Sequence, residues 1–251
     1  MNVKEFYEYM CRELPSELSL EGDSDGMSCC PDPEREVRTV LIALDATAAV
    51  VDEAIEEGYD VILTHHPMLF GGVDEIVAGN YKSDKLIKLI RNGIAVMGFH
   101  TRLDAIDGGV NDMLARLLGL EEIEKFGEGN IGRIGTLPSP ISAEELALLV
   151  RDTLGAPKVE FSDCGKLISR VAVVGGSGSD ELSAAIFAGA DAFVSGELKY
   201  HAMTDSSDYG ISLVAAGHFY TENPVCARLF ELCAEADIIS TITFSNRIGT
   251  V

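Results

Sequence analysis

Two of the five histidines in this 251-residue chain, His65 and His66, are adjacent. They directly follow Val61–Leu63, an apolar run that is typical of a buried strand. In α/β folds, ligands collect outside the carboxyl ends of the strands. Neighbouring side chains on an extended chain point to opposite sides, so two adjacent imidazoles can reach two different ions. The pair therefore predicts a metal site, although a lone histidine is more often structural.

A third histidine and a carboxylate follow another apolar segment. His100 and Asp104 come after Ile94–Gly98, which also has the pattern of a strand. Asp104 precedes a run rich in Gly, Asp and Asn, so it can equally be a turn residue or a helix cap. Both residues are candidates for the same site because they leave the end of a neighbouring predicted strand.

A third strand end offers a histidine and a glutamate. His218 follows the predicted strand Ile211–Ala215, and Glu222 stands four residues later near the start of a helix. The glutamate can be a metal ligand or only a first-turn charge that the helix dipole favours. The remaining histidine, His201, is expected on a helix as a polar surface residue.

Together these strand ends combine imidazole with carboxylate, which suits Fe, Mn, Zn, Ni or Co better than Ca or Mg alone. Five protein ligands shared by two ions would leave coordination positions for water, as in hydrolytic dinuclear sites. The predicted cofactor is therefore a pair of divalent metal ions per chain. The predicted metal ligands are His65, His66, Asp104, His218 and Glu222.

A glycine-rich stretch, GGSGSD at residues 175–180, follows the predicted strand Ser169–Val174 and opens a helix. Such a turn can cradle a phosphate group with its backbone N–H groups. It is neither a G-x-G-x-x-G sequence nor a P-loop, because no Gly-Lys-Ser/Thr follows. The alternative is a tight strand-to-helix turn capped by Ser179 or Asp180.

The charge of the chain limits its partners. It has 41 acidic and 19 basic residues, a formal net charge of −22. A nucleic-acid or anionic membrane surface has to be met by clustered Lys and Arg, so neither is an expected partner. No apolar run approaches the roughly 20 residues of a membrane span, and the N-terminus lacks the pattern of a signal peptide. A cytoplasmic protein is expected.

The cysteines do not form a structural zinc motif, because none stands in a CxxC pair. In a chain of this length without a signal peptide, free thiols are the default. The six are Cys11, Cys29, Cys30, Cys164, Cys226 and Cys233.

Strands and helices alternate through most of the chain, which predicts an α/β fold with mainly parallel sheets. The pattern A-I-x-x-G-x-D-x, followed by two apolar residues and Thr or Ser, occurs at 54–64 and again at 185–195. It favours two similar α/β lobes, although any junction of a helix, a glycine and a strand can look like this. We expect the metal site between the two lobes. We place the first lobe at 1–125, with 238–251 as a segment that can return to it, and the second at 126–237. The predicted strands are Val37–Leu44, Val61–Leu63, Ile94–Gly98, Ser169–Val174, Ala192–Val194, Ile211–Ala215 and Ile238–Phe244.

These motifs resemble, in order, those of the Nif-three-like family, the YbgI-like dinuclear metal proteins labelled GTP cyclohydrolase 1 type 2 homologues. The resemblance runs from about Val37 to the C-terminus. The segments that carry it are THHPMLF at 64–70, HTRLDA at 100–105, GGVND at 108–112, GGSG at 175–178, SGELKYH at 195–201 and AGHFYTE at 216–222.

The resemblance implies two similar α/β domains, a toroidal homohexamer and a two-metal site with the five ligands named above. It implies Glu222 as the bridging ligand and His100 close by, as part of the ligand shell or as the catalytic acid or base. The stretch from about 120 to 168 is too short for the middle domain that some members carry. Where relatives usually have a D-N-x-G-L-like segment, this chain has Asp23-Ser24-Asp25-Gly26-Met27, followed by Cys29-Cys30.

The function that the resemblance implies is metal-dependent hydrolysis of a small molecule, of the GTP cyclohydrolase type. Nothing in the sequence spells out guanine recognition, and the metal pair suits phosphoester or amide substrates equally. The alternative is a non-catalytic, metal-binding hexameric scaffold, a metal chaperone or an interacting regulatory factor.

Overall fold

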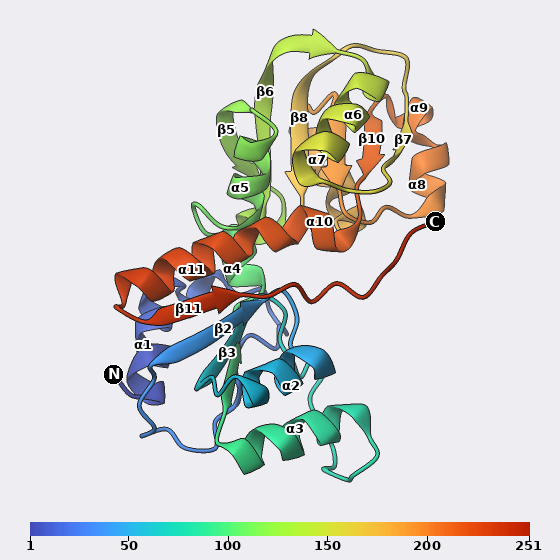
Figure 1. Cartoon of the computed structure of the whole chain (residues 1–251). Helices are drawn as coiled ribbons and strands as arrows, with labels where there is room; N and C mark the ends of the chain where they lie inside the picture. Colours follow the sequence, from blue (N-terminus) through green and yellow to red (C-terminus); the bar gives the residue numbers. More distant parts are fainter. The chain divides into compact units, whose positions relative to one another are not determined.

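The computed structural model describes residues 1–251 and divides them into two units. The first unit contains Met1–Leu103 and Val225–Arg247, and the second contains Asp104–Pro224 and Ile248–Val251 (Figure 1). These divisions differ from those expected near residues 125 and 237. The first unit resumes at Val225 instead of at 238, because helix α11 (Cys226–Glu235) packs on strand β11 (Ile239–Ile242). That strand belongs to the first sheet.

The first unit is built on a five-stranded sheet in the order β1-β4-β3-β2-β11. All of its pairings are parallel except that of β1 with β4. The remaining bounds in this sheet are β1 Gly26–Cys29, β2 Thr39–Ala43, β3 Val61–Thr64 and β4 Ala95–Gly98.

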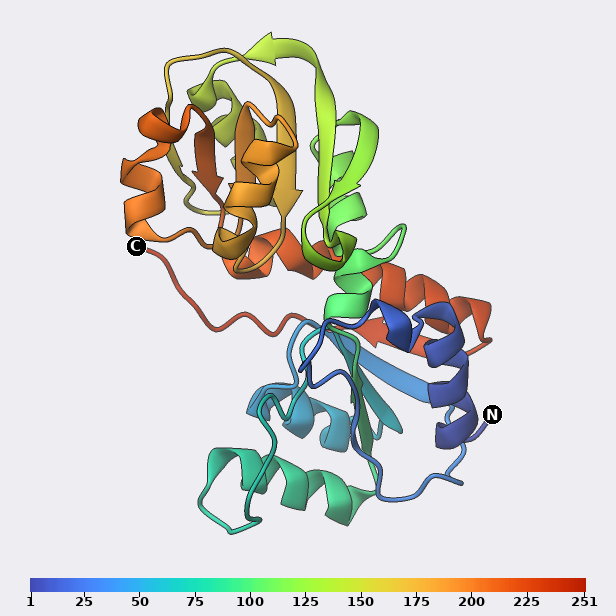
Figure 2. The ribbon, with the colours of Figure 1, turned by 180° about the vertical axis from the view of Figure 1, so that it is seen from behind.

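Helices cover both faces of the first sheet, as Figures 1 and 2 show. On one face, apolar residues of α2 and α3 such as Val50 and Leu89 form a core with Leu41, Ile62 and Val96 of the strands. On the other face lie α1 and α11, joined by a hydrogen bond from the Tyr9 hydroxyl to a carbonyl of α11. Burial on both faces explains why these strands are continuous apolar runs. The helices are α1 Val3–Glu13, α2 Ala48–Glu56 and α3 Tyr81–Asn92.

The second unit contains a six-stranded sheet in the order β5-β6-β8-β9-β10-β7. Its centre, β8-β9-β10, is parallel, and antiparallel strands flank that centre on each side. The bounds are β5 Glu121–Phe126, β6 Gly132–Ile141, β7 Glu160–Ser162, β8 Ile168–Val174, β9 Ala192–Ser195 and β10 Ser212–Ala215.

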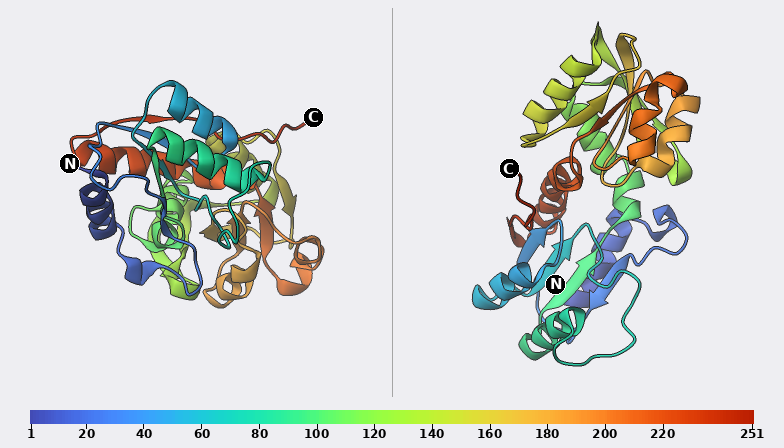
Figure 3. Two further views of the ribbon diagram at one scale, coloured as in Figure 1. Left: turned by 90° about the horizontal axis from the view of Figure 1, so that it is seen from below. Right: turned by 90° about the vertical axis from the view of Figure 1, so that its right-hand side faces the viewer.

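The second sheet is also covered on both faces (Figure 3). Val171 and Val173 of β8 face a core with α5 and α6, whereas the alternate residues Ala172 and Val174 face α7 and α8. This alternation is the ordinary two-residue period of a strand. The two α/β units predicted from the sequence are thus confirmed. The helices are α4 Thr101–Ala105, α5 Val110–Leu117, α6 Ala143–Leu154, α7 Leu182–Phe187, α8 Tyr200–Thr204, α9 Ser206–Tyr209 and α10 His218–Glu222.

Four strands, β1, β5, β6 and β7, are absent from the sequence-based expectation, and each of them makes antiparallel pairs. Antiparallel strands at the side of a sheet need no continuous apolar run. Strand β5 has the sequence EEIEKF and is largely exposed, and β6 contains two prolines. No helix of the chain is both long and apolar enough to cross a bilayer.

The repeated sequence pattern corresponds to a repeated structural contact. The Asp60 carboxylate accepts hydrogen bonds from the backbone N–H groups of Arg38 and Thr39, at the start of β2. The Asp191 carboxylate accepts the same pair of bonds from Ser169 and Arg170, at the start of β8. Each aspartate therefore ties the turn before one strand to the beginning of the neighbouring strand.

Replacing Asp60 with Asn is expected to lower the free energy of unfolding by about 2 kcal/mol at neutral pH, because charge-assisted hydrogen bonds are lost from a buried site. Burial favours a higher pKa for Asp60, but hydrogen bonds from Arg38 and Arg35 hold the pKa below its usual range. A carboxylate with a depressed folded-state pKa loses its stabilisation as pH falls through that pKa. Urea unfolding should therefore show the two proteins converging below about pH 4. Asp74→Asn, at an exposed aspartate without an ion pair, is the control and should leave stability unchanged.

Candidate metal centre

Three neighbouring strands of the first sheet end at the same level. In the register of the sheet Ala43 of β2 lies beside Thr64 of β3, and Thr64 beside Gly98 of β4. The polar residues that follow these ends are Asp45, the pair His65-His66, and His100. Parallel pairing therefore brings them to one edge of the sheet, where ligands of α/β folds collect.

His65, His66 and His100 form one group at this edge. Their ring nitrogens offer ligand atoms that all lie within 4.8 Å of one another. The ring centroids are 4.8 Å apart for His65 and His66, 5.2 Å for His65 and His100, and 5.6 Å for His66 and His100. The expectation that the adjacent pair points to opposite sides is wrong. The strand ends at Thr64, whose hydroxyl donates to the His66 carbonyl at 2.6 Å and turns the chain.

Each of the three rings is held through its Nδ1 atom by an oxygen. The His65 Nδ1 lies 3.1 Å from the carbonyl oxygen of Phe99. The His66 Nδ1 lies 2.7 Å from Asp45 Oδ1, and the His100 Nδ1 lies 3.0 Å from Asp23 Oδ1. A carbonyl or carboxylate oxygen can only accept, so in the neutral ring the proton is on Nδ1 and the lone pair is on Nε2.

This arrangement fits the metal ions that the sequence predicts. Histidine ligands of metals characteristically donate their other ring N–H to a carboxylate or a backbone carbonyl, which fixes the tautomer and the ring orientation. A set of imidazole nitrogens suits Fe, Co, Ni and Zn. The group thus has both the donor chemistry and the supporting hydrogen bonds of a transition-metal site.

The loop before β1 is tied to His100 by two aspartates. Asp23 also accepts hydrogen bonds from the backbone N–H and the hydroxyl of Thr101, at 3.1 and 2.6 Å. Burial favours a higher pKa for Asp23, but the bonds from His100 and Thr101 outweigh it and hold the pKa far below its usual range. Asp25 accepts the His100 backbone N–H and forms a buried ion pair with Arg102 at 2.9 Å. The loop before β1 therefore supports His100.

The second sheet ends in the same way. Val174, Ser195 and Ala215 lie side by side at the ends of β8, β9 and β10. His218 and Glu222 follow β10 on helix α10, where the His218 Nε2 lies 2.9 Å from the buried Glu222 carboxylate. A histidine and a glutamate one helical turn apart project to the same side, as a metal-ligating pair requires.

The glycine-rich loop after β8 does not have the hydrogen bonding of a phosphate cradle. Its Gly175 N–H donates to the Asn111 side chain at 2.7 Å, and its Gly176 N–H donates to the Thr221 hydroxyl at 3.0 Å. The Gly178 N–H donates to the Ser195 hydroxyl at 2.9 Å. These three donors are already engaged inside the unit. The loop is therefore a tight strand-to-helix turn. The expected cap by Ser179 or Asp180 is not formed, because no side chain caps the helical segments that follow the loop.

Glycine at position 176 allows this loop to approach α10. Gly176 has a φ of +61°, and a Cβ placed there would overlap the Glu222 carboxylate and come within 3.0 Å of the His218 Nε2. A Cβ at Gly196 would lie 2.7 Å from the His218 Cα. The absence of side chains at these two glycines leaves the space that the His218–Glu222 pair occupies.

Asp104 lies in the short helix α4, which begins directly after His100. The segment that follows it is held by Arg133, which is almost completely buried. Its guanidinium donates to the carbonyls of Ala105 and Ile106 at 2.9 and 3.0 Å and to the Asp112 carboxylate at 3.2 Å. These bonds fix the chain immediately beyond Asp104.

Comparison with known proteins settles the relationship. A family model described as Duf34/NIF3 (NGG1p interacting factor 3) matches residues 1–248. The chain belongs to this family. A curated relative from Clostridium perfringens, named GTP cyclohydrolase 1 type 2 homolog, is 34% identical over 211 residues, which cover 81% of this chain and 80% of the relative.

Solved structures show that the NIF3 fold extends over the whole chain. The Staphylococcus aureus hypothetical protein SA1388 superposes with a TM-score of 0.87 at 26% identity and covers 100% of this chain and 99% of its own. Reduced HcgD from Methanocaldococcus jannaschii gives a TM-score of 0.84 at 26% identity over 96% of this chain and 97% of that one.

The sequence analysis of this NIF3-family chain missed two residues of the centre, Asp23 and Asp45. Asp45 follows the end of β2, so the strand-end rule that selects His65 and His100 also applies to it. Asp23 has no comparable signal, because it lies in a loop remote in sequence from His100. The fifth histidine, His201, is exposed on α8, as expected.

Gly176→Ala is expected to weaken metal binding at least tenfold, because the added methyl group displaces the Glu222 carboxylate. Isothermal titration with Mn²⁺ or Zn²⁺ measures the effect. Gly165→Ala is the matched control: Gly165 also has a positive φ, +80°, but a Cβ there would meet nothing within 4 Å. Equal metal affinities in the two variants would show that the close approach has no role in binding.

Asp23→Asn is expected to weaken metal binding about 10- to 100-fold, the usual effect of losing a carboxylate that orients a histidine ligand. Glu21→Gln, at an exposed residue of the same loop, should bind like the parent chain. Histidine NMR resonances of the metal-free protein provide a second measurement. A His100 ring that keeps its Nδ1 proton and its chemical shift in Asp23→Asn would contradict the orienting role.

Proposed function

We propose that this chain is a dinuclear metal-binding protein whose ions serve hydrolysis of a small-molecule substrate. The observation that carries the proposal is the histidine group of the first unit, in which each Nδ1 is held by an oxygen. A buried histidine of any kind needs an acceptor for its ring N–H, but here the three acceptors also leave the lone pair of every ring on Nε2. A metal site needs this arrangement, because the ligand atom has to be unprotonated.

The proposed ligands come from both units. His65 and His66 leave the first sheet, and Asp104, His218 and Glu222 belong to the second unit. The support is that each unit places donors of its own just beyond equivalent strand ends. Glu222 is the proposed bridge because a carboxylate has two oxygens, one for each of two ions.

Bound divalent ions supply Lewis acidity toward a substrate oxygen and toward water. The chain's own proposed contribution to the chemistry is His100. Its ring lies beside those of His65 and His66, with Nδ1 held by Asp23. Asp23 would stabilise an imidazolium ring, so His100 can hold a proton at Nε2 and pass it to a leaving group as a general acid. The same position also allows it to serve as a ligand.

The proposed substrate is a nucleotide of the GTP type or a related phosphoester or amide. The support is the name that curated relatives carry, GTP cyclohydrolase 1 type 2 homolog. The chain's net charge of −22 gives no long-range attraction for a polyphosphate, so bound cations would have to supply the counter-charge. A substrate screen should therefore always include the metal.

The family description, NGG1p interacting factor 3, favours a second candidate function: a non-catalytic metal-binding scaffold, metal chaperone or regulatory partner. His100→Gln discriminates between the two functions. Catalysis predicts that turnover is lost even at metal concentrations that restore full occupancy, whereas a scaffold has no turnover to lose.

We also propose a homohexamer, which light scattering would detect as six times the mass of one chain.

Elemental analysis of the purified, tag-free protein is expected to find about two transition-metal ions per chain. His66→Ala and Glu222→Ala should each lose metal while the circular dichroism spectrum stays unchanged, because both residues lie beyond the strand ends rather than inside a strand. His201→Ala, at the exposed histidine, is the control and should keep its metal.

The two variants also test whether the units share the ions. If the ions are shared, His66→Ala should also lower metal binding by the donors of the second unit. Likewise, Glu222→Ala should also lower metal binding by the donors of the first unit. Metal contents that fall independently would indicate two separate sites. Less than one ion per chain in the parent protein, after anaerobic reloading with Fe, Mn or Zn, would refute the metal assignment and favour the scaffold.

A further inference from the structure

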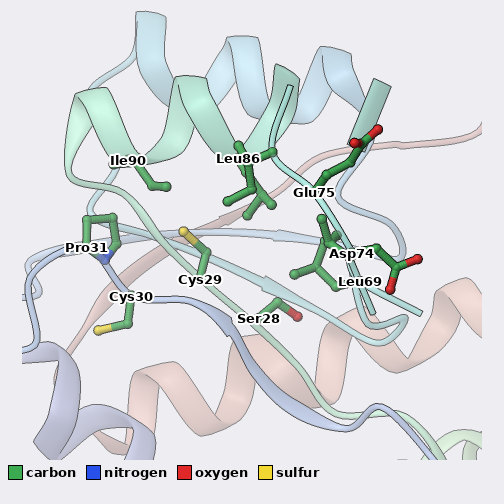
Figure 4. A pocket seen from close by; sticks show the side chains of 11 residues that line it. Ser28, Cys29, Cys30, Pro31, Leu69, Asp74, Glu75, Leu86 and Ile90 are labelled. Atoms are coloured by element: carbon green, nitrogen blue, oxygen red, sulfur yellow. The ribbon is translucent and has the colours of Figure 1, made fainter. Parts of the chain in front are cut away.

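A cavity of about 650 Å³ lies in the first unit, apart from the histidine group. It is formed by the segment that leaves β1, the loop that follows the His65-His66 pair, and helix α3 (Figure 4). None of the proposed metal ligands lines it. A volume of this size is typical of small-molecule sites, which usually span about 300–1,000 Å³.

The walls of the cavity are mostly apolar and partly open to solvent. Leu69, Val73 and Leu86 line it together with Ile76 and Ile90. Ile76 is 56% exposed and Ile90 is 50% exposed. Removing large aliphatic side chains from water lowers the free energy of the system. A ligand that covers these two isoleucines would therefore bind through its apolar part.

Two carboxylates mark one end of the cavity. Asp74 and Glu75 are both exposed, and neither forms an ion pair within the chain. In Figure 4 their side chains lie at the opposite end from Cys30, Pro31 and Ile90. The chain carries a net charge of −22 and has no basic residue in the lining of this cavity. An anionic ligand would therefore be repelled, whereas a cation would be attracted to that end.

We propose that this cavity binds an elongated small molecule with an apolar body and a primary ammonium group at one end. The body packs between Leu86, Ile90 and Ile76, and the ammonium group pairs with Asp74 and Glu75. The cavity shares no residue with the metal centre, so this proposal stands or fails independently of the proposed hydrolysis.

Cys30 offers a way to observe occupancy. It lines the cavity and is the exposed cysteine of the chain, whereas the neighbouring Cys29 is buried. Burial raises the pKa of the Cys30 thiol, with a further contribution from Asp32, so alkylation is best followed at mildly alkaline pH. A ligand in the cavity should slow the reaction of Cys30 with N-ethylmaleimide. Cys30→Ser removes this signal and identifies it.

The test uses three probes with the same apolar part: 4-phenylbutylamine, 4-phenylbutanol and 4-phenylbutyrate. Calorimetry on the full chain should rank them in that order. Asp74→Asn combined with Glu75→Gln should weaken the amine about fivefold, as expected for exposed ion pairs, without changing the alcohol. Glu56→Gln with Glu57→Gln is the matched control, because it removes another adjacent exposed acidic pair and the same charge.

Ile90→Ala should weaken all three probes, since it shortens the apolar wall. We expect the amine to protect Cys30 in the parent chain and in the Glu56–Glu57 variant. In the Asp74–Glu75 variant, the same protection should need about five times more amine. Equal affinity for the amine and the acid would overturn the proposed role of the carboxylates. Binding of none of the probes, or binding without protection of Cys30, would overturn the site itself.

Discussion

The hydrogen bond from each histidine Nδ1 to an oxygen is the interaction on which the candidate centre depends. An imidazole that leaves a strand end can rotate and can carry its proton on either nitrogen. The Phe99 carbonyl, Asp45 and Asp23 remove that freedom for His65, His66 and His100. Much of the first unit serves these acceptors: β4 places the carbonyl, β2 ends just before Asp45, and the loop before β1 brings in Asp23. The Ser245 hydroxyl, near the end of the chain, in turn donates to Asp45 at 3.3 Å.

The two units use the same strand-end geometry for different purposes. In the first, the Phe99 N–H donates to the Thr64 carbonyl at 3.0 Å, and in the second the Ala216 N–H donates to the Ser195 carbonyl at 2.9 Å. At the first edge the chain places imidazoles, and at the second it places glycines. The glycines take little space and keep their N–H groups bonded to Asn111 and Thr221. That leaves room for a His–Glu pair presented by a helix instead of a strand end.

Buried or half-buried charges maintain this framework at a few points. Asp60 and Asp191 occupy equivalent turns and bind equivalent pairs of backbone N–H groups. Arg133 and Arg102 hold carbonyl groups on the segments beside α4 and α1. Buried charges are tolerated only where hydrogen bonds replace water, and each of these has several. The large acidic excess lies elsewhere, and many of its carboxylates are exposed on the surface.

The sequence alone determined the α/β class, the central parallel strands and the residues at their carboxyl ends. Buried parallel strands must be apolar on both faces, so the runs that end before His65 and at Ala215 can be recognised as strands from the sequence. It did not reveal the antiparallel flanks, because strands such as EEIEKF are largely exposed and lack that pattern. It also left the role of the glycine-rich loop open. Only the tertiary structure decided which residues orient the histidines and where the loop's N–H groups go, since both depend on contacts such as Asp23 with His100 that join distant parts of the chain.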